Sequence, residues 1–195
     1  YGDLFLGKTT VLTKDTPAFI ANRIGVFGMM ATMKIMEKLQ LSVDEIDALT
    51  GPVAGRPKSA TFRTADVVGI DTLVKVAKGV YENCPSDEAK DSFNIPGGLP
   101  KPVEQNLLGD KSGHGFFKKI KSPNGKSEIQ VLNLQTLEYT ARQKPKFATL
   151  ETAKSIDDLP TRLKALVSGT DKAAEFYRQF HYSLFSYISH RIPEI

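Results

Sequence analysis

The sequence predicts a mainly α-helical fold with one small β hairpin. Apolar residues recur at helical spacing along most of the chain, and Ser, Thr or Asp residues stand where the helices would begin. An Asn-Gly turn lies between two short alternating segments, which is typical of a hairpin. No strand–helix–strand alternation occurs in the 195 residues, so we expect no nucleotide-binding Rossmann unit in this chain.

The first long helix is expected over residues 17–40, after an extended lead-in over residues 1–14. Thr16 can accept hydrogen bonds from the free N–H groups of the first turn, and Pro17 suits the first helical position because it has no N–H to leave unpaired. Apolar residues cover nearly every side of this helix, so other elements must surround it as the hub of the fold. Two glycines inside it indicate close packing of a neighbour: Gly25 and Gly28.

Capping residues mark the next three helices. Ser42 and Glu45, three residues apart, form a capping-box pattern that begins a helix. Another helix is expected to begin at Ser59 or Thr61 and to end at Gly69. Asp71 is expected to cap the helix that follows.

The hairpin follows a short helix expected over residues 103–108. Residues 113–117, Gly-His-Gly-Phe-Phe, lead into it, residues 123–125 form its turn, and residues 128–132 form the return strand. We expect residues 134–148 to be irregular.

Three more helices are expected over residues 149–155, 158–168 and 171–191. The last is rich in aromatic residues at helical spacing, a pattern that indicates a buried core or a partner surface more than a cofactor site. Its aromatic residues are Phe176, Tyr177, Phe180, Tyr182, Phe185 and Tyr187.

Composition and charge exclude several classes of protein. The net charge of +4 is too small to indicate DNA binding, and no nucleic-acid reading helix accompanies the basic cluster between residues 111 and 146, so we favour a solvated basic face over a binding patch. Cys84 is the only cysteine, which excludes an intrachain disulfide and a thiolate metal cage. The longest uncharged apolar stretch, residues 24–33, is too short to span a bilayer, and no signal peptide is visible, so we expect a cytoplasmic protein with no membrane span.

Asn22 is the one residue whose position suggests chemistry. It is polar and neutral, lies one turn into a helix that otherwise demands burial, and precedes Arg23. One interpretation is structural: Asn22 bonds to a neighbouring backbone group and Arg23 ties down a loop. The other is that the amide faces a cleft and donates a hydrogen bond to a carbonyl oxygen. The histidines do not have the spacing of a metal pair on a helix, so no metal site is expected.

Four segments occur in an order and with a composition that match one family. They are Lys14-Asp15-Thr16-Pro17-Ala18-Phe19-Ile20-Ala21-Asn22-Arg23, Ser42-Val43-Asp44-Glu45-Ile46-Asp47, Phe62 with Asp66-Val67-Val68-Gly69-Ile70-Asp71-Thr72, and Gly109-Asp110-Lys111-Ser112-Gly113-His114-Gly115-Phe116-Phe117. Together they resemble the motifs of the C-terminal helical domain of the 3-hydroxyacyl-CoA dehydrogenases. The resemblance covers about residues 8–121.

The resemblance implies the helical part of an NAD-dependent enzyme of fatty-acid β-oxidation, which oxidises L-3-hydroxyacyl-CoA to 3-ketoacyl-CoA. In that family NAD is bound by a Rossmann domain, which is absent from this chain, and the helical domain closes over the acyl-CoA and mediates dimerisation. The catalytic His and its partner Glu lie before the first motif, so the 195-residue chain alone is expected to be inactive. The family's signature asparagine maps onto Asn22, which makes Asn22 the candidate catalytic residue.

The chain departs from the family pattern at two places. Ala18 stands where the motif usually has glycine, and residues 55–63 replace a glycine-rich segment. Lys58 in that segment is a weak candidate for contact with a CoA phosphate, although a solvated turn lysine is the interpretation that we favour.

The resemblance also divides the chain. Residues 1–14 would lead in from a missing NAD-binding domain, residues 15–121 would form the helical C-terminal domain, and residues 122–170 the hairpin return and connector. Residues 171–195 would begin a second, truncated helical repeat, as in larger bacterial proteins that carry an enoyl-CoA hydratase region. We expect a homodimer or pseudo-dimer through helical domains, and no nucleic-acid partner. The alternative is a non-catalytic helical interaction module.

Overall fold

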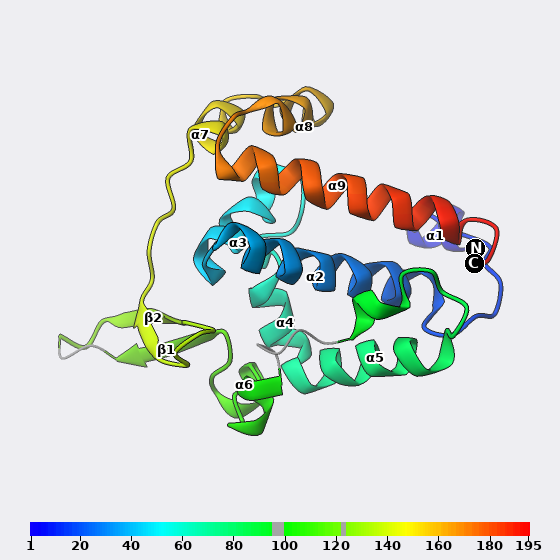
Figure 1. The fold of residues 1–195 in the computed structure, drawn as a ribbon. Helices are drawn as coiled ribbons and strands as arrows, with labels where there is room; N and C mark the ends of the chain where they lie inside the picture. Colours follow the sequence, from blue (N-terminus) through cyan, green and yellow to red (C-terminus); the bar gives the residue numbers. More distant parts are fainter. Residues whose placement is uncertain (95–99, 122–123) are drawn as a thin grey trace.

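The computed structural model describes residues 1–94, 100–121 and 124–195. Helices form the main body, and a small antiparallel sheet lies at one side of it (Figure 1). The predicted fold class, mainly α with a small β element, is confirmed.

Helix α2 (Phe19–Leu39) is the hub of this body. Helix α9 (Lys172–Arg191) runs alongside it in the opposite direction, and α5 (Ile70–Asn83) lies on its other side (Figure 1). Of the two glycines in α2, Gly28 faces α9, where a Cβ would make ordinary contacts with Phe180 and Leu184 at 3.8–3.9 Å, and Gly25 faces open space. An alanine would fit at both positions, so the expectation that close packing requires these glycines is wrong.

The N-terminal segment differs from the predicted extended lead-in. Residues Gly2–Leu6 form a short helix, α1, with no buried residue. The carboxylate of Asp3 accepts the backbone N–H of Thr10 at 3.1 Å and so holds the chain back against this helix. A five-residue helix without a buried face carries no apolar periodicity that sequence analysis could detect.

Helix α3 (Val43–Leu49) begins with the predicted capping box. The N–H of Ser42 donates to Glu45 Oε2 at 2.7 Å, and the N–H of Glu45 donates to Ser42 Oγ at 3.2 Å. The 3₁₀ turn η1 (Pro52–Ala54) follows.

Helix α4 (Phe62–Val68) begins within one residue of the predicted range, with Thr61 at its N-cap. The free N–H groups of the first turn of α4 bond to a side chain from another helix, Asp47 of α3. The Asp47 carboxylate accepts the backbone N–H groups of Thr61, Phe62 and Arg63 at 2.7–3.1 Å. Asp47 is buried, and burial raises its pKa to about 6 although the three N–H donors oppose the shift.

The predicted cap of α5 by Asp71 is wrong. The N-cap position belongs to Gly69, whose φ of 101° turns the chain sharply between α4 and α5, and no side chain caps the helix. Asp71 therefore lies inside the first turn, where it forms an ion pair with Lys111. The turn at Gly69 begins the helix two residues earlier than a cap at Asp71 would allow.

The sheet has three strands in the order β1-β2-β3: Phe117–Lys121, Ser127–Leu132 and Tyr139–Ala141. The first two form the predicted hairpin, with Phe117 opposite Val131. The predicted turn at residues 123–125 lies partly outside the described residues. The third strand corrects the expectation that residues 134–148 are irregular. Three residues carry too little alternation to be recognised, and pairing with β2 places them in the sheet.

The carboxylate of Asp66 fastens this sheet to the helices. It accepts the backbone N–H groups of Phe116 and Phe117 at 2.8 and 2.9 Å. The backbone passes Asp66 so closely that a Cβ at Gly109 would meet its carbonyl oxygen, and a Cβ at Gly115 its side chain, both at 2.2 Å. These contacts join two of the four sequence motifs into one structural unit.

The short helix expected over residues 103–108 lies earlier in the chain, as α6 (Pro100–Glu104). The 3₁₀ turns η2 (Lys90–Phe93) and η3 (Asp110–Ser112) lie on either side of it in sequence. After the sheet, an extended segment leads to α7 (Ala148–Lys154) and α8 (Leu159–Ser168), which agree with the predicted helices (Figure 1).

The aromatic residues of α9 divide between core and surface. Phe176, Tyr177, Phe180 and Tyr187 are buried, which confirms the core interpretation for these four. Tyr182 is 72% exposed and Phe185 59% exposed. No helix among the described residues is long and apolar enough to cross a membrane.

Candidate functional site

Asn22 lies in the first turn of α2, and its side chain is exposed. Within the described parts of the chain, no hydrogen bond from another residue reaches this amide. The structural alternative, in which Asn22 bonds to a neighbouring backbone group, therefore has no support in the structure. Its N–H₂ group can donate, and its carbonyl oxygen can accept, from a molecule outside the chain.

The helix that carries Asn22 begins later than predicted. It starts at Phe19, and Ala18 occupies the N-cap position without a side-chain hydrogen bond. Thr16 accepts the N–H of Phe19 through its carbonyl oxygen at 3.1 Å, whereas its buried hydroxyl has no partner among the described residues. The predictions of a cap at Thr16 and a first helical residue at Pro17 are therefore wrong.

The reason is the backbone at residues 18 and 19. Ala18 and Phe19 have φ angles of 66° and 49°, in the left-handed region, so the chain makes a further turn before the helix begins. This conformation suits the glycine that the motif usually has at this position and costs an alanine roughly 1 kcal/mol. The departure from the motif at Ala18 is thus a point of strain immediately before the Asn22 turn.

Arg23, the next residue, is completely buried. Its Nη2 donates to Asp87 Oδ2 at 2.7 Å and to Glu194 Oε1 at 3.0 Å. Its Nε donates to the same Asp87 oxygen at 3.1 Å and to the hydroxyl of Tyr187 at 2.9 Å. Asp87 lies between α5 and η2, so Arg23 does tie down a loop, which is the one part of the structural interpretation that the structure supports.

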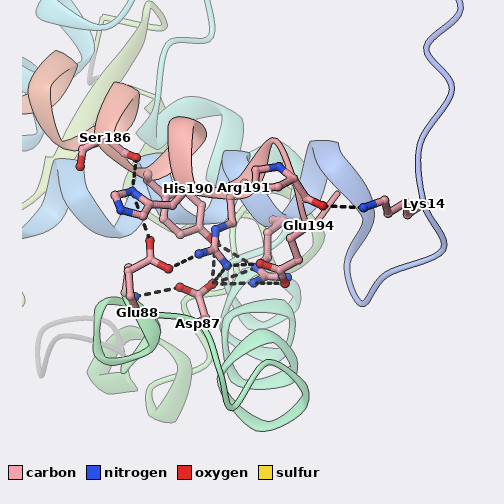
Figure 2. Close-up of polar contacts among 11 residues, drawn as sticks. Lys14, Asp87, Glu88, Ser186, His190, Arg191 and Glu194 are labelled. Carbon is pink, nitrogen blue, oxygen red and sulfur yellow. Dashed lines mark hydrogen bonds and ion pairs between the residues drawn. The ribbon is translucent and has the colours of Figure 1, made fainter.

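The end of α9 closes the same cluster (Figure 2). Arg191, also buried, lies between the acidic groups and pairs with Glu88, Glu194 and Asp87. Lys14 reaches the cluster from the segment before α2 and donates to the carbonyl oxygen of Pro193. Four segments of the chain therefore meet at the start of α2.

Electrostatics favour the charged form of the buried pair. Burial alone would raise the pKa of Asp87, but hydrogen bonds from Arg23, Tyr187 and the N–H of Ala89 outweigh it and hold that pKa below its ordinary value. Burial would likewise lower the pKa of Arg23, and its bonds to Asp87 and Tyr187 raise it instead. The pair stays ionised at neutral pH and locks the buried guanidinium in place.

Lys58 does not join this cluster. It is exposed in the segment between η1 and α4, and no ion pair or hydrogen bond engages it among the described residues. Within the same parts of the chain, no group of three His, Cys, Asp or Glu residues could hold a metal ion.

Sequence analysis missed the partners of Arg23. Asp87 lies in a polar turn and Tyr187 among other aromatic residues, so neither attracts notice alone. The available signal was Arg23 itself, because a buried guanidinium requires an acidic partner. The position of that partner, 64 residues away, is a property of the fold.

Comparisons with known proteins agree with this structure. Residues 19–119, just over half of the chain, match the family described as "3-hydroxyacyl-CoA dehydrogenase, C-terminal domain". A Bacillus subtilis (strain 168) protein named "Probable 3-hydroxyacyl-CoA dehydrogenase" is 46% identical over 173 residues, which cover 89% of this chain and 21% of that protein. A Deinococcus radiodurans protein of the same name is 46% identical over 126 residues, or 65% of this chain and 36% of that protein. The human "Hydroxyacyl-coenzyme A dehydrogenase, mitochondrial" is 36% identical over 114 residues, or 58% and 35%.

The chain spans about a fifth to a third of the length of these relatives. The Bacillus match is longer than the family domain and extends into the segment after residue 119. The likeness is therefore not confined to the residues that carry the four motifs.

Proposed function

This chain belongs to the 3-hydroxyacyl-CoA dehydrogenase family, and from that membership we propose that it is the substrate-closing helical domain of an NAD-dependent 3-hydroxyacyl-CoA dehydrogenase. The full-length protein would oxidise L-3-hydroxyacyl-CoA to 3-ketoacyl-CoA in fatty-acid β-oxidation. NAD would be bound by a domain outside this chain, which alone would be inactive.

The exposed amide of Asn22 carries the proposal. It is unengaged by the rest of the described chain, while the adjacent Arg23 is buried and held by at least three side chains. A donor fixed beside an anchored residue is suited to meet the substrate oxygen as charge develops on it. We propose that Asn22 donates a hydrogen bond to that oxygen, whereas the acid–base residues of the reaction lie outside this chain.

Lys58 is the second proposed contact. Its exposure and lack of internal partners leave its ammonium group available for a phosphate of CoA.

The C-terminal segment is proposed to begin a second helical repeat and to serve a homodimer or pseudo-dimer. The exposed apolar side chains on its outer face support this: Tyr182, Phe185 and Ile192. The cytoplasmic location remains a prediction from the sequence.

The test of Asn22 is Asn22→Ala in the full-length protein. We expect kcat/KM to fall by about 10- to 1000-fold, because the loss of one stabilising donor typically costs up to about 1000-fold. The matched control is Glu37→Ala, an exposed residue at the far end of the same helix, which should retain normal activity. A normal kcat/KM for Asn22→Ala would remove its assigned role.

The alternative, a non-catalytic interaction module, makes a different prediction. In that case the full-length protein would not reduce NAD with 3-hydroxyacyl-CoA, and Asn22→Ala would change nothing that the wild type can do. The exposed aromatic face of α9 would then be the functional feature, measurable through self-association.

A further inference from the structure

The first turn of α2 lacks the usual means of fixing its orientation. Ala18 at the N-cap position provides no side-chain hydrogen bond, and the hydroxyl of Thr16 engages no donor among the described residues. Ala18 and Phe19 are in the left-handed region, which is unfavourable for both. Something other than a cap must hold this turn in position.

The cluster around Arg23 provides that support. Residues 22 and 23 are separated by about 100° around the helix axis, so the two side chains leave the turn in different directions. Arg23 points into the interior and Asn22 to solvent. A rotation of the turn large enough to displace the Asn22 amide would also strain the hydrogen bonds of Arg23 to Asp87 and Glu194.

Tyr187 connects this cluster to α9. Its hydroxyl accepts from Arg23 Nε at 2.9 Å and donates to Asp87 Oδ2 at 2.8 Å. Its ring stacks on Phe27, one turn further along α2, with centroids 3.9 Å apart and planes 7° from parallel. Tyr187 is 2% exposed and lies outside the residues that match the family domain.

We propose that Tyr187 is a positioning residue for the reaction: acting through Arg23 and Asp87, it fixes the turn that presents Asn22 to the substrate. This inference rests on the proposed role of Asn22. It assigns to the segment after residue 119 a part in the chemistry, in addition to its packing on α2.

The test is Tyr187→Phe in the full-length protein. The change removes one oxygen atom and keeps the ring on Phe27, and Arg23 Nε retains its bond to Asp87. We expect kcat to fall about 10-fold with KM little changed, because misplacement of a reacting group acts on the transition state more than on substrate binding.

Tyr177→Phe is the matched control. Tyr177 is on the same helix, is 1% exposed, and its hydroxyl donates a hydrogen bond to the carbonyl oxygen of Leu49, the last residue of α3 and far from the first turn of α2. The control variant should lower the unfolding temperature through the loss of a buried hydroxyl, although less than Tyr187→Phe, whose lost hydroxyl bonds to two charged groups, and leave kcat unchanged. Equal losses of kcat in both variants would overturn the proposal, since they would show a general effect of stability.

The double variant Asn22→Ala/Tyr187→Phe tests the positioning role of Tyr187 separately from the proposed role of Asn22. If Tyr187 acts through Asn22, Tyr187→Phe should cause no further loss of kcat in the Asn22→Ala background. Additive losses, or a normal kcat for Tyr187→Phe when Asn22→Ala is impaired, would overturn the positioning role and leave the proposed function intact. A normal kcat for Asn22→Ala would remove the role proposed for Asn22, and with it the basis of this inference.

Glu194→Gln provides a second route should Tyr187→Phe not fold. Glu194 is partly exposed and accepts from Arg23 Nη2, so its replacement weakens the same support. It also pairs with Arg191, so the folding of this variant is checked by circular dichroism before kcat is measured. We expect kcat to fall about 3-fold, again without effect in the Asn22→Ala background. An unchanged kcat in the folded Glu194→Gln variant would count against the proposal.

Discussion

Replacement of Asp66 tests how the sheet is fastened to the helices. Asp66→Ala would leave the backbone N–H groups of Phe116 and Phe117 without their acceptor, in a region where Asp66 is 1% exposed and Phe116 completely buried. Each buried donor left unsatisfied costs about 1–3 kcal/mol, so the loss of the acceptor of two donors should lower the unfolding free energy by about 2–6 kcal/mol at about pH 5.

The pH dependence of this loss follows from the burial of Asp66. Burial raises its pKa to about 6 from an ordinary value of 3.8. A carboxyl whose folded-state pKa is raised stabilises the protein below the ordinary value and loses that contribution as pH rises through about 6. Alanine does not titrate, so the difference between wild type and Asp66→Ala should shrink by roughly 2 kcal/mol between about pH 4 and 7.

The assay is urea unfolding of the 195-residue chain followed by circular dichroism, with amide hydrogen exchange at Phe116 and Phe117. The control is Asp110→Ala, which removes the exposed ion pair with Arg63 and should cost less than about 1 kcal/mol. The reasoning fails if Asp66→Ala is as mild as this control at about pH 5, or if its cost grows as pH rises.

Two further predictions concern the buried pair and the missing cofactor domain. The pKa of Asp87 is held below its ordinary value of 3.8, so its stabilising contribution is present above that pH and is lost as pH falls through the folded-state pKa. Asp87→Asn should therefore flatten the acid side of the stability profile, measured by urea unfolding below about pH 4; an unchanged slope would contradict the ionised pair. The 195-residue chain should show no NAD binding by calorimetry, because neither its sequence nor its described three-stranded antiparallel sheet has the strand–helix–strand unit that binds dinucleotides. Micromolar binding would contradict our assignment of the cofactor to another domain.

Local sequence signals determined the helices and their order. Ser42 with Glu45, and the apolar spacing from Phe19 to Leu39, act within one or two turns, so they could be recognised without the fold. The predicted caps at Thr16 and Asp71 failed because they depended on the backbone conformation of neighbouring residues, which the local residue pattern does not show. The left-handed turn at Ala18 displaced the cap expected at Thr16, and the turn at Gly69 displaced the one expected at Asp71.

The candidate site follows the same division. The sequence alone determined that Asn22 and Arg23 are adjacent at the start of a helix that demands burial, and it marked the Asp66 and Gly109–Phe117 segments as motifs. Only the tertiary structure decided that Arg23 meets Asp87 and Tyr187, 64 and 164 residues away. The apolar periodicity of α2 predicts that Arg23 is buried and therefore needs an acidic partner. Which residues serve as its partners depends on the packing of α9 and of the loop after α5 against α2, which the local pattern does not show.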